Sequence, residues 1–352
     1  ASAMIRLLPL LLATGCAVNG QRAAVHTSGL PVMRVATADG ASVALQRHPR
    51  PGAPAVLLCH GISSNHHFWD LDPEHSLAVH LYDAGYDVWN LDLRGHGFAV
   101  RGADGRRPKP DWTIDSYGQH DLPAAIDAVH DAIGDQALHY VGHSLGGMVL
   151  AIYLADHPDP PLATATIVAS PLGFDAPESL TRFMVGTAPR TRFIARWPTG
   201  WLSQGLVLMG PLAPRRLHAM LYEPSNLSPR TRRRMLRHIV SPMVRGEVQQ
   251  LAQLSDGHFL SSDGARTYAD ELGAVRLPML FIAGRADHIA PPDGVRAYHD
   301  AVGSADRTWV MASAANGFSA DYGHLDLGLG EAASTEVFPV IRQFIDAHTE
   351  PQ

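Results

Sequence analysis

Short, mostly apolar runs recur along this chain, with helical patterns of apolar and polar residues between them. The apolar runs cover residues 55–59, 86–91, 137–141, 163–169, 277–283 and 307–311. The helical patterns cover residues 76–83, 122–133, 145–155, 292–301 and 336–348. Apolar strands that alternate with helices are typical of a mostly parallel sheet that is covered on both faces. The pattern therefore predicts an α/β fold.

Two stretches near the start of the chain, residues 32–38 and 43–47, alternate between apolar and polar side chains. They flank Asp39 and Gly40, a pair that favours a tight turn. Because alternation with a period of two marks a half-buried strand, these residues predict a β-hairpin.

The regular succession of strands and helices breaks once, between residues 172 and 271. This stretch is helix-like, interrupted by prolines and rich in large apolar side chains such as Trp197 and Trp201. We interpret it as an inserted helical lid. The predicted organisation is a signal segment (1–16), a linker (17–31), a core (32–171 and 272–352) and the lid (172–271).

The composition is that of a globular protein. Of the 352 residues, 46% are hydrophobic and 18% are charged, which is enough apolar material for a sizeable core. The formal net charge of −6 gives no reason to expect nucleic acid as a partner. The one basic cluster, residues 230–237, is interpreted as a solvated helix face.

The N-terminal segment has the layout of an export signal. Arg6, a short apolar run and small residues precede Cys16. The ending Ala13-Thr14-Gly15-Cys16 resembles a bacterial lipoprotein signal, which implies a lipid on Cys16 and a place on the periplasmic side of the envelope or at the outer membrane. An ordinary N-terminal helix or strand in a cytoplasmic protein is the alternative. Since the apolar run is too short to span a bilayer, that lipid is the only membrane contact predicted.

A Gly-x-Ser-x-Gly sequence, Gly142 to Gly146, joins the apolar run 137–141 to the helical pattern 145–155. In this context it is typical of a nucleophile elbow, where a serine lies on a strained turn between a strand and a helix. The two glycines supply the room that such a turn needs. Ser144 is therefore the candidate nucleophile.

A serine nucleophile needs a base, and the base needs a carboxylate to orient it. On a sheet of this kind the order is serine, acid, histidine, each after a separate strand. Asp287 follows the run 277–283, and His324 lies in the loop after the last run. We predict Asp287 as the acid and His324 as the base.

Other acids compete for the role of Asp287. Asp175 follows the run 163–169 and is the alternative acid. Asp326 is interpreted as a structural or supporting residue.

Acyl transfer also needs two N–H donors for the oxyanion. Leu145 follows the nucleophile at a helix N-terminus, where the helix dipole favours negative charge. The loop His60-Gly61-Ile62 follows the run 55–59, and the N–H of Ile62 is the second candidate donor. The side chain of His60 is interpreted as bracing this loop.

Phe68 and Trp69 are candidates for the wall of an acyl pocket, although core packing explains them equally well. Arg94-Gly95-His96-Gly97 is interpreted as a structural loop. The adjacent His66 and His67 are weak evidence for a metal, because no His-x-x-x-His with a helical glutamate and no cysteine pair at ligand spacing is present. No phosphate-binding glycine motif is present either. No metal and no cofactor are predicted.

Together these residues resemble the α/β-hydrolases and, among them, the acid lipase group of gastric and lysosomal lipases. The residues that carry the resemblance are 60–61, 76–89, 117–124, 138–144 and 322–326. The resemblance implies an α/β-hydrolase fold with a lid, Ser144 as nucleophile, Asp287 as acid and His324 as base.

The departures from that group bear on the substrate. Leu145 stands where those lipases usually have glutamine, residues 91–97 have the commoner bacterial hydrolase form, and the lid sequence is not recognisable. The resemblance therefore favours ester hydrolysis more than it favours triacylglycerol as the substrate.

The predicted function is that of a serine carboxylester hydrolase, lipase-like, that cleaves small-molecule or lipidic esters with an apolar acyl chain. An acyltransferase with the same three residues is one alternative. A non-catalytic binding protein with this fold is the other. The oligomeric state stays open.

Overall fold

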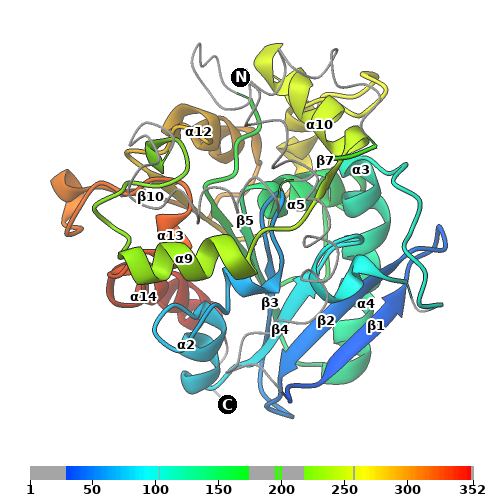
Figure 1. Ribbon diagram of the computed structural model, residues 1–352, viewed down its shortest axis with the longest axis horizontal. Coiled ribbons are helices and arrows are strands. Elements are labelled where there is room, and N and C mark those ends of the chain that lie inside the picture. Colours follow the sequence, from blue (N-terminus) through cyan, green and yellow to red (C-terminus); the bar gives the residue numbers. More distant parts are fainter. Residues whose placement is uncertain are drawn as a thin grey trace, which may run out of the picture.

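A sheet of eight strands runs through the centre of the computed structural model, which describes residues 29–102, 104–173, 195–197, 199, 218–256 and 258–349 (Figure 1). The strands are β1 (Val32–Ala36), β2 (Ser42–His48), β3 (Ala55–Cys59), β4 (Asp87–Asp92), β5 (Leu138–His143), β6 (Thr164–Val168), β9 (Met279–Gly284) and β10 (Arg307–Ala312). Their order across the sheet is β1-β2-β4-β3-β5-β6-β9-β10. β2 is antiparallel to β1 and to β4, and all other pairs are parallel. The predicted hairpin and the predicted mostly parallel sheet are confirmed.

Helices cover both faces of the sheet (Figure 1). On one face α2 (Leu77–Asp83) packs against α14 (Ala333–Ala347), which is joined by α13 (Asp326–Leu329). On the other face α4 (Leu122–Ile133), α5 (Leu145–Asp156), α11 (Tyr268–Glu271) and α12 (Pro292–Ala301) form a row in which neighbours touch. α5 is apolar on all sides and buried along almost its whole length, as expected of a helix in the middle of such a row.

The register of the central strands brings their C-terminal ends to one level. Cys59, the last residue of β3, pairs with Leu91 of β4 and with Gly142 of β5. Gly142 in turn pairs with Ile167 of β6. Because the strands are parallel, the loops that follow them gather at a single edge of the sheet.

A π-helical segment, η4 (Tyr117–Asp121), connects α3 (Ile114–Ser116) to α4 without interruption. The sequence pattern predicted only α4. At Gly118 a Cβ would lie 2.4 Å from the Cβ of Ile152 in α5, so only glycine allows this close crossing of the two helices.

The segment predicted as a lid is described only in part, and its division from the core stays a prediction. The described part contains α9 (Pro229–His238), α10 (Arg245–Ala252) and a two-stranded antiparallel sheet of β7 (Arg196–Trp197) and β8 (Met243–Val244). The prediction that this segment is helical was therefore incomplete. Trp201 lies outside the described residues.

Short helical turns complete the described secondary structure: η2 (His66–Phe68), η3 (Gly97–Val100), η7 (Gln253–Asp256), η8 (Leu272–Ala274) and η9 (Ala314–Asn316). Among the helices described, none has the length and apolar character that crossing a bilayer requires.

Candidate active site

Ser144, Asp287 and His324 meet at the C-terminal edge of the sheet. The Oγ of Ser144 lies 2.9 Å from the Nε2 of His324. The Nδ1 of His324 lies 2.8 Å from the Oδ2 of Asp287. The three residues follow β5, β9 and β10, and all three are buried. The structure thus brings together the three residues that were predicted from their order along the chain.

Ser144 lies on a sharp turn between β5 and α5, with φ of 51° and ψ of −115°. A side chain in this region of backbone space costs of order 1–3 kcal/mol, which the surrounding structure must hold in place. Its backbone N–H donates to the carbonyl of Val168, which anchors the turn to β6. At Gly142 a Cβ would lie 2.7 Å from the backbone of Gly146, so larger residues do not fit beside the serine.

The loop after β3 lies directly against Ser144. At Gly61 a Cβ would be 3.2 Å from the Cβ of Ser144. In the part of the chain that the structure describes, the backbone N–H groups of Ile62 and Leu145 donate to no acceptor. These are the two groups predicted as oxyanion donors, and they flank the serine.

The imidazole of His60 holds this loop in place. Its Nδ1–H donates to the carbonyl of Gly61 at 2.8 Å, and its Nε2 accepts from the N–H of Leu93 at 3.3 Å. Burial, together with the nearby charge of His96, lowers the pKa of His60 to about 3, so that the ring is neutral. These contacts agree with the structural role that the sequence predicted for His60.

A family model described as the alpha/beta hydrolase fold matches residues 54–316. The matched range covers the candidate nucleophile, the candidate acid and most of the sheet. The chain belongs to the alpha/beta hydrolase fold family.

Curated relatives of this α/β hydrolase include lipases. Gastric triacylglycerol lipase of Homo sapiens is 34% identical over 154 residues, which make up 38% of this chain and 38% of that lipase. Triacylglycerol lipase 2 of Arabidopsis thaliana is 38% identical over 129 residues, or 33% of this chain and 31% of that lipase. The matched segment therefore spans about a third of the length of these relatives. The similarity to acid and gastric lipases is distant, and it agrees with the resemblance seen in the sequence.

Solved structures share the fold over most of the chain. An esterase from Thermogutta terrifontis superposes with a TM-score of 0.61 at 18% identity, over 91% of this chain and 100% of that one. A monoacylglycerol lipase from Paleococcus ferrophilus gives a TM-score of 0.57 at 18% identity, over 87% of this chain and 99% of that one. At these identities the likeness establishes the α/β-hydrolase fold alone.

His143, the residue before the candidate nucleophile, was not among the predicted site residues of this α/β hydrolase. Its Nε2–H donates to the backbone carbonyl of His324 at 3.1 Å. Its ring stacks on Phe68 at 4.0 Å and lies 4.7 Å from the ring of His324. Burial, together with the charge that His324 can carry, holds the pKa of His143 far below its usual range. A neutral His143 thus joins the elbow to the backbone of the candidate base.

The carboxylate of Asp287 is fixed from its far side. Its Oδ1 accepts the N–H groups of Ile289 and Ala290, each at 2.8 Å. The second oxygen therefore faces His324 in a defined orientation.

Asp326 supports the loop of His324 through contacts with neighbouring backbone and with Asn226. Its carboxylate accepts the N–H of Gly323 at 2.9 Å and the side-chain amide of Asn226 at 2.7 Å. Burial raises the pKa of Asp326. The competing acid, Asp175, lies outside the described residues, and so does Cys16.

Phe68 and Trp69 are fully buried behind the site. Phe68 packs against His143, and the indole Nε1–H of Trp69 donates to the carbonyl of Cys59 at 2.9 Å. The contacts that the structure records for these two residues are core contacts. Their proposed role as walls of an acyl pocket stays a prediction.

A second buried polar group connects the core to α10. Glu247 accepts the hydroxyl of Tyr117 and lies 3.4 Å from the Nε2 of His96. The Nδ1–H of His96 donates to the carbonyl of Ser64 at 2.8 Å. Burial disfavours a charged imidazole, yet the hydrogen bond and charge of Glu247 raise the pKa of His96. The sequence placed His96 in a structural loop but gave no indication of its partner.

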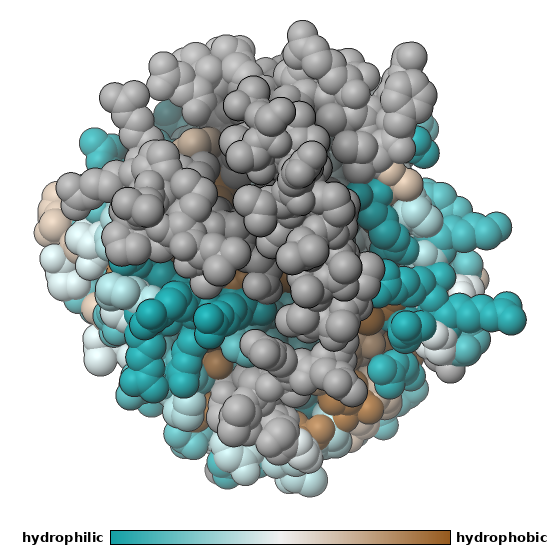
Figure 2. Space-filling view, viewed as in Figure 1, coloured by the Kyte–Doolittle hydropathy of each residue, from teal (hydrophilic) through white to brown (hydrophobic). Residues whose placement is uncertain are grey.

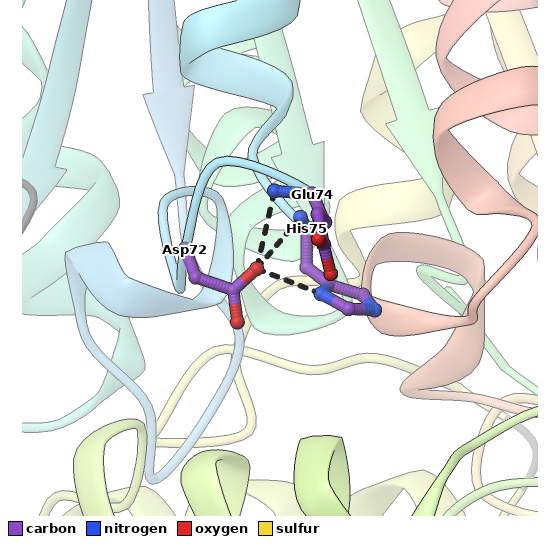
Figure 3. A group of neighbouring side chains, drawn as sticks. All are labelled: Asp72, Glu74 and His75. Carbon is purple, nitrogen blue, oxygen red and sulfur yellow. Dashed lines mark hydrogen bonds and ion pairs between the residues drawn. The ribbon is translucent and has the colours of Figure 1, made fainter.

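Among the described residues, one group has the composition of a metal site: Asp72, Glu74 and His75 (Figure 3). The Oδ1 of Asp72 accepts the Nδ1–H of His75 at 2.8 Å, and its Oδ2 pairs with the guanidinium of Arg234. A cation here would have to displace both hydrogen bonds and would lie beside a fixed positive charge. The contacts describe an ion pair that fastens α9 to the core.

Proposed function

We propose that this protein is a serine carboxylester hydrolase that cleaves esters with an apolar acyl chain through an acyl-enzyme on Ser144. The observation that carries the proposal is the continuous line of hydrogen bonds from Ser144 through His324 to Asp287. It lies beside the N–H groups of Ile62 and Leu145, which donate to no described acceptor. The lipases and esterases among the relatives support the same class of reaction.

In the proposed reaction His324 accepts the hydroxyl proton of Ser144 at Nε2 while Oγ attacks the ester carbonyl carbon. The imidazolium that forms keeps its Nδ1–H on Asp287, whose negative charge stabilises it. His324 then donates the proton to the leaving alkoxide, and the alcohol departs. Water adds to the acyl-enzyme by the same proton transfers in reverse, which releases the acid and restores Ser144.

The negative charge on the carbonyl oxygen develops beside the N–H groups of Ile62 and Leu145. Donors that are already in place at such a position contribute several kcal/mol to acyl transfer, since no reorganisation is needed during the reaction. Leu145 also opens α5, so the positive end of the helix dipole points at the same oxygen.

A Ser144→Ala variant tests the proposal. We expect it to lose p-nitrophenyl ester hydrolysis by a factor of about 10⁴ or more. We also expect it to lose covalent labelling by a fluorophosphonate. Ser170→Ala is the matched control, because Ser170 is a buried serine just after the neighbouring strand, and its hydroxyl donates to the carbonyl of Val168. Unchanged hydrolysis in the Ser144→Ala protein would overturn the proposal.

The acyl preference needs a separate measurement. A series of p-nitrophenyl esters from acetate to palmitate should give a kcat/KM that rises with chain length before it levels off. Each methylene buried in an apolar pocket adds about 0.8 kcal/mol. A steady fall from acetate onward would contradict the apolar acyl site while leaving the serine chemistry intact.

We also propose, from the sequence, that Cys16 carries a lipid and that the protein is an exported lipoprotein of the cell envelope. Cys16→Ser should abolish palmitate incorporation and, at high ionic strength, recovery in the membrane fraction. If the variant still fractionates with membranes and still incorporates palmitate, this proposal fails.

A further inference from the structure

Helix α9 lies between the two loops that carry the candidate oxyanion donor and the candidate base. Eight residues before the helix begins, the carbonyl of Leu221 accepts the N–H of Leu325, next to His324. At its other end, the side-chain amide of Asn65 donates to the carbonyls of His238 and Ile239. The helix therefore spans one side of the site, from the His324 loop to the loop that follows Ile62.

The two faces of α9 differ completely in chemistry. Its buried stripe consists of Thr231, Met235 and Leu236. Arg230, Arg233 and Arg237 are exposed, and their spacing of three and four residues places them along one side of the helix, opposite that stripe. In Figure 2 strongly hydrophilic side chains mark this part of the surface, facing the viewer.

No described residue neutralises the charge of these three guanidinium groups. In the described part of the chain none of the three forms an ion pair. The acids next to the helix are already engaged: Asp72 pairs with Arg234, and Glu331 accepts the N–H of Ser228 at 2.9 Å. The whole chain has a formal charge of −6, so this is a local positive face on an acidic protein.

We propose that the face formed by Arg230, Arg233 and Arg237 docks onto an anionic phospholipid surface. A guanidinium presents a planar fork of N–H donors that matches a phosphate, and a row of them on one helix face can meet several headgroups at once. Because α9 borders both site loops, docking through this face places the site edge next to the lipid. The proposal goes beyond ester hydrolysis and does not depend on it, since docking requires no reaction.

The proposed docking depends on charge rather than on the insertion of apolar side chains into the membrane. Among the described large hydrophobic residues only Met33 is exposed, and it lies on β1, outside α9. Docking should therefore be strong at low ionic strength and weak at high salt, where the Debye length falls to about 3 Å at 1 M. Vesicles of zwitterionic lipid should bind little protein at any salt concentration.

The test is co-sedimentation of the full chain with vesicles of phosphatidylcholine, with and without 30% phosphatidylglycerol. All proteins carry Cys16→Ser, so that a lipid on this residue contributes nothing. The test variant combines Arg230→Gln, Arg233→Gln and Arg237→Gln. The matched control combines Arg106→Gln, Arg107→Gln and Lys109→Gln, which removes three exposed positive charges from a loop before α3. A thermal melt of each protein checks that the fold is kept.

We expect the Cys16→Ser parent to bind the anionic vesicles and the α9 variant to lose about a hundred-fold in partitioning, since each basic residue at an anionic surface contributes about fivefold. The control should lose less than a few-fold. Equal losses in both variants would mean that overall charge, not α9, drives binding, and the proposal would be wrong. Equal binding to vesicles with and without phosphatidylglycerol would overturn it as well. Ester hydrolysis is not measured, so these results stand whether or not Ser144 is a nucleophile.

Discussion

The imidazole of His143 donates a hydrogen bond to the backbone carbonyl of His324 at 3.1 Å. This single contact joins residues that are 181 positions apart, and it ties the turn of the candidate nucleophile to the loop of the candidate base. The distance between Ser144 and His324 is thus set by a backbone contact as well as by their own hydrogen bond. We regard His143 as a positioning residue for the proposed reaction.

Replacing His143 should impair catalysis more than substrate binding. His143→Phe keeps an aromatic ring against Phe68 but removes the N–H that holds His324. We expect kcat to fall about ten- to a hundred-fold with little change in KM, because small misplacements of a base have effects of this size. His143→Gln can place an N–H near the same carbonyl and should recover most of the loss. Steady-state kinetics on a soluble p-nitrophenyl ester measure both.

His139→Phe provides the matched control for this prediction. His139 is a buried histidine in the same strand, and it bonds Thr164 at 2.9 Å and Thr349 at 3.1 Å, away from the site. The His139→Phe protein should be less stable than the parent but should keep its kcat. A His143→Phe protein with normal kcat, or a His143→Gln protein no better than it, would contradict the positioning role.

Asp287→Asn should lower kcat about ten-thousand-fold with the fold intact. The N–H groups of Ile289 and Ala290 need an oxygen as their acceptor, so the amide oxygen of the asparagine must take the place of Oδ1. The amide nitrogen must then face His324. His324 would then have to accept at Nδ1 and carry its proton on Nε2, where it could not take the proton of Ser144. Asp326→Asn, an equal change two residues after His324, should reduce kcat far less. Similar losses in the two variants would argue against Asp287 as the acid.

The sequence was sufficient to predict the sheet and the meeting of Ser144, Asp287 and His324, because both depend on local patterns taken in order. Each strand is a short apolar run, and each candidate residue follows the end of one. In parallel strands those ends meet at one edge, so the order Ser144, Asp287, His324 already implied a common site. The nucleophile elbow could also be predicted from neighbouring residues alone, since its glycines lie within two residues of the serine.

What the sequence did not predict depends on contacts between distant segments. The pairing of His96 with Glu247 joins residues 151 positions apart. The π-helical segment η4 packs closely against α5 at Gly118, and no local spacing indicates this contact. The two-stranded sheet β7–β8 has only two residues in each strand, too few for any alternation to be visible.

Gly61→Ala should disturb the proposed oxyanion site through the backbone. The added Cβ would lie 2.8 Å from the Nδ1 of His143 and 3.2 Å from the Cβ of Ser144, and neither group can move far. The loop must therefore shift and carry the N–H of Ile62 away from the oxyanion. We expect kcat/KM to fall about ten- to a hundred-fold, as for other partly displaced oxyanion donors.

Gly273→Ala is the control for this change, because nothing lies within 4 Å of the Cβ it would add. Its activity should match that of the parent. If Gly61→Ala is equally active, the loop after β3 does not supply the donor.

The buried pair of His96 and Glu247 should make stability depend on pH. The folded pKa of His96 is raised, so the stability that the pair contributes is fully present below the unfolded pKa of about 6.5. It is lost as the pH rises through the folded pKa. We expect Glu247→Gln to destabilise the protein by about 3 kcal/mol at pH 6, and by less as the pH approaches 9. Thermal melts of both proteins at each pH give this difference, in which contributions from other histidines cancel.

Glu336→Gln is the control that shows how the loss of a carboxylate changes stability when no described pairing with a histidine is lost. Glu336 also accepts a tyrosine hydroxyl, that of Tyr322 at 2.7 Å, but no described histidine pairs with it. Its substitution should lower the melting temperature by a similar amount at every pH between 6 and 9. For Glu247→Gln a difference that stays constant over this range would mean that His96 is neutral throughout. A difference that shrinks with rising pH would mean that a charged histidine holds α10 to the core.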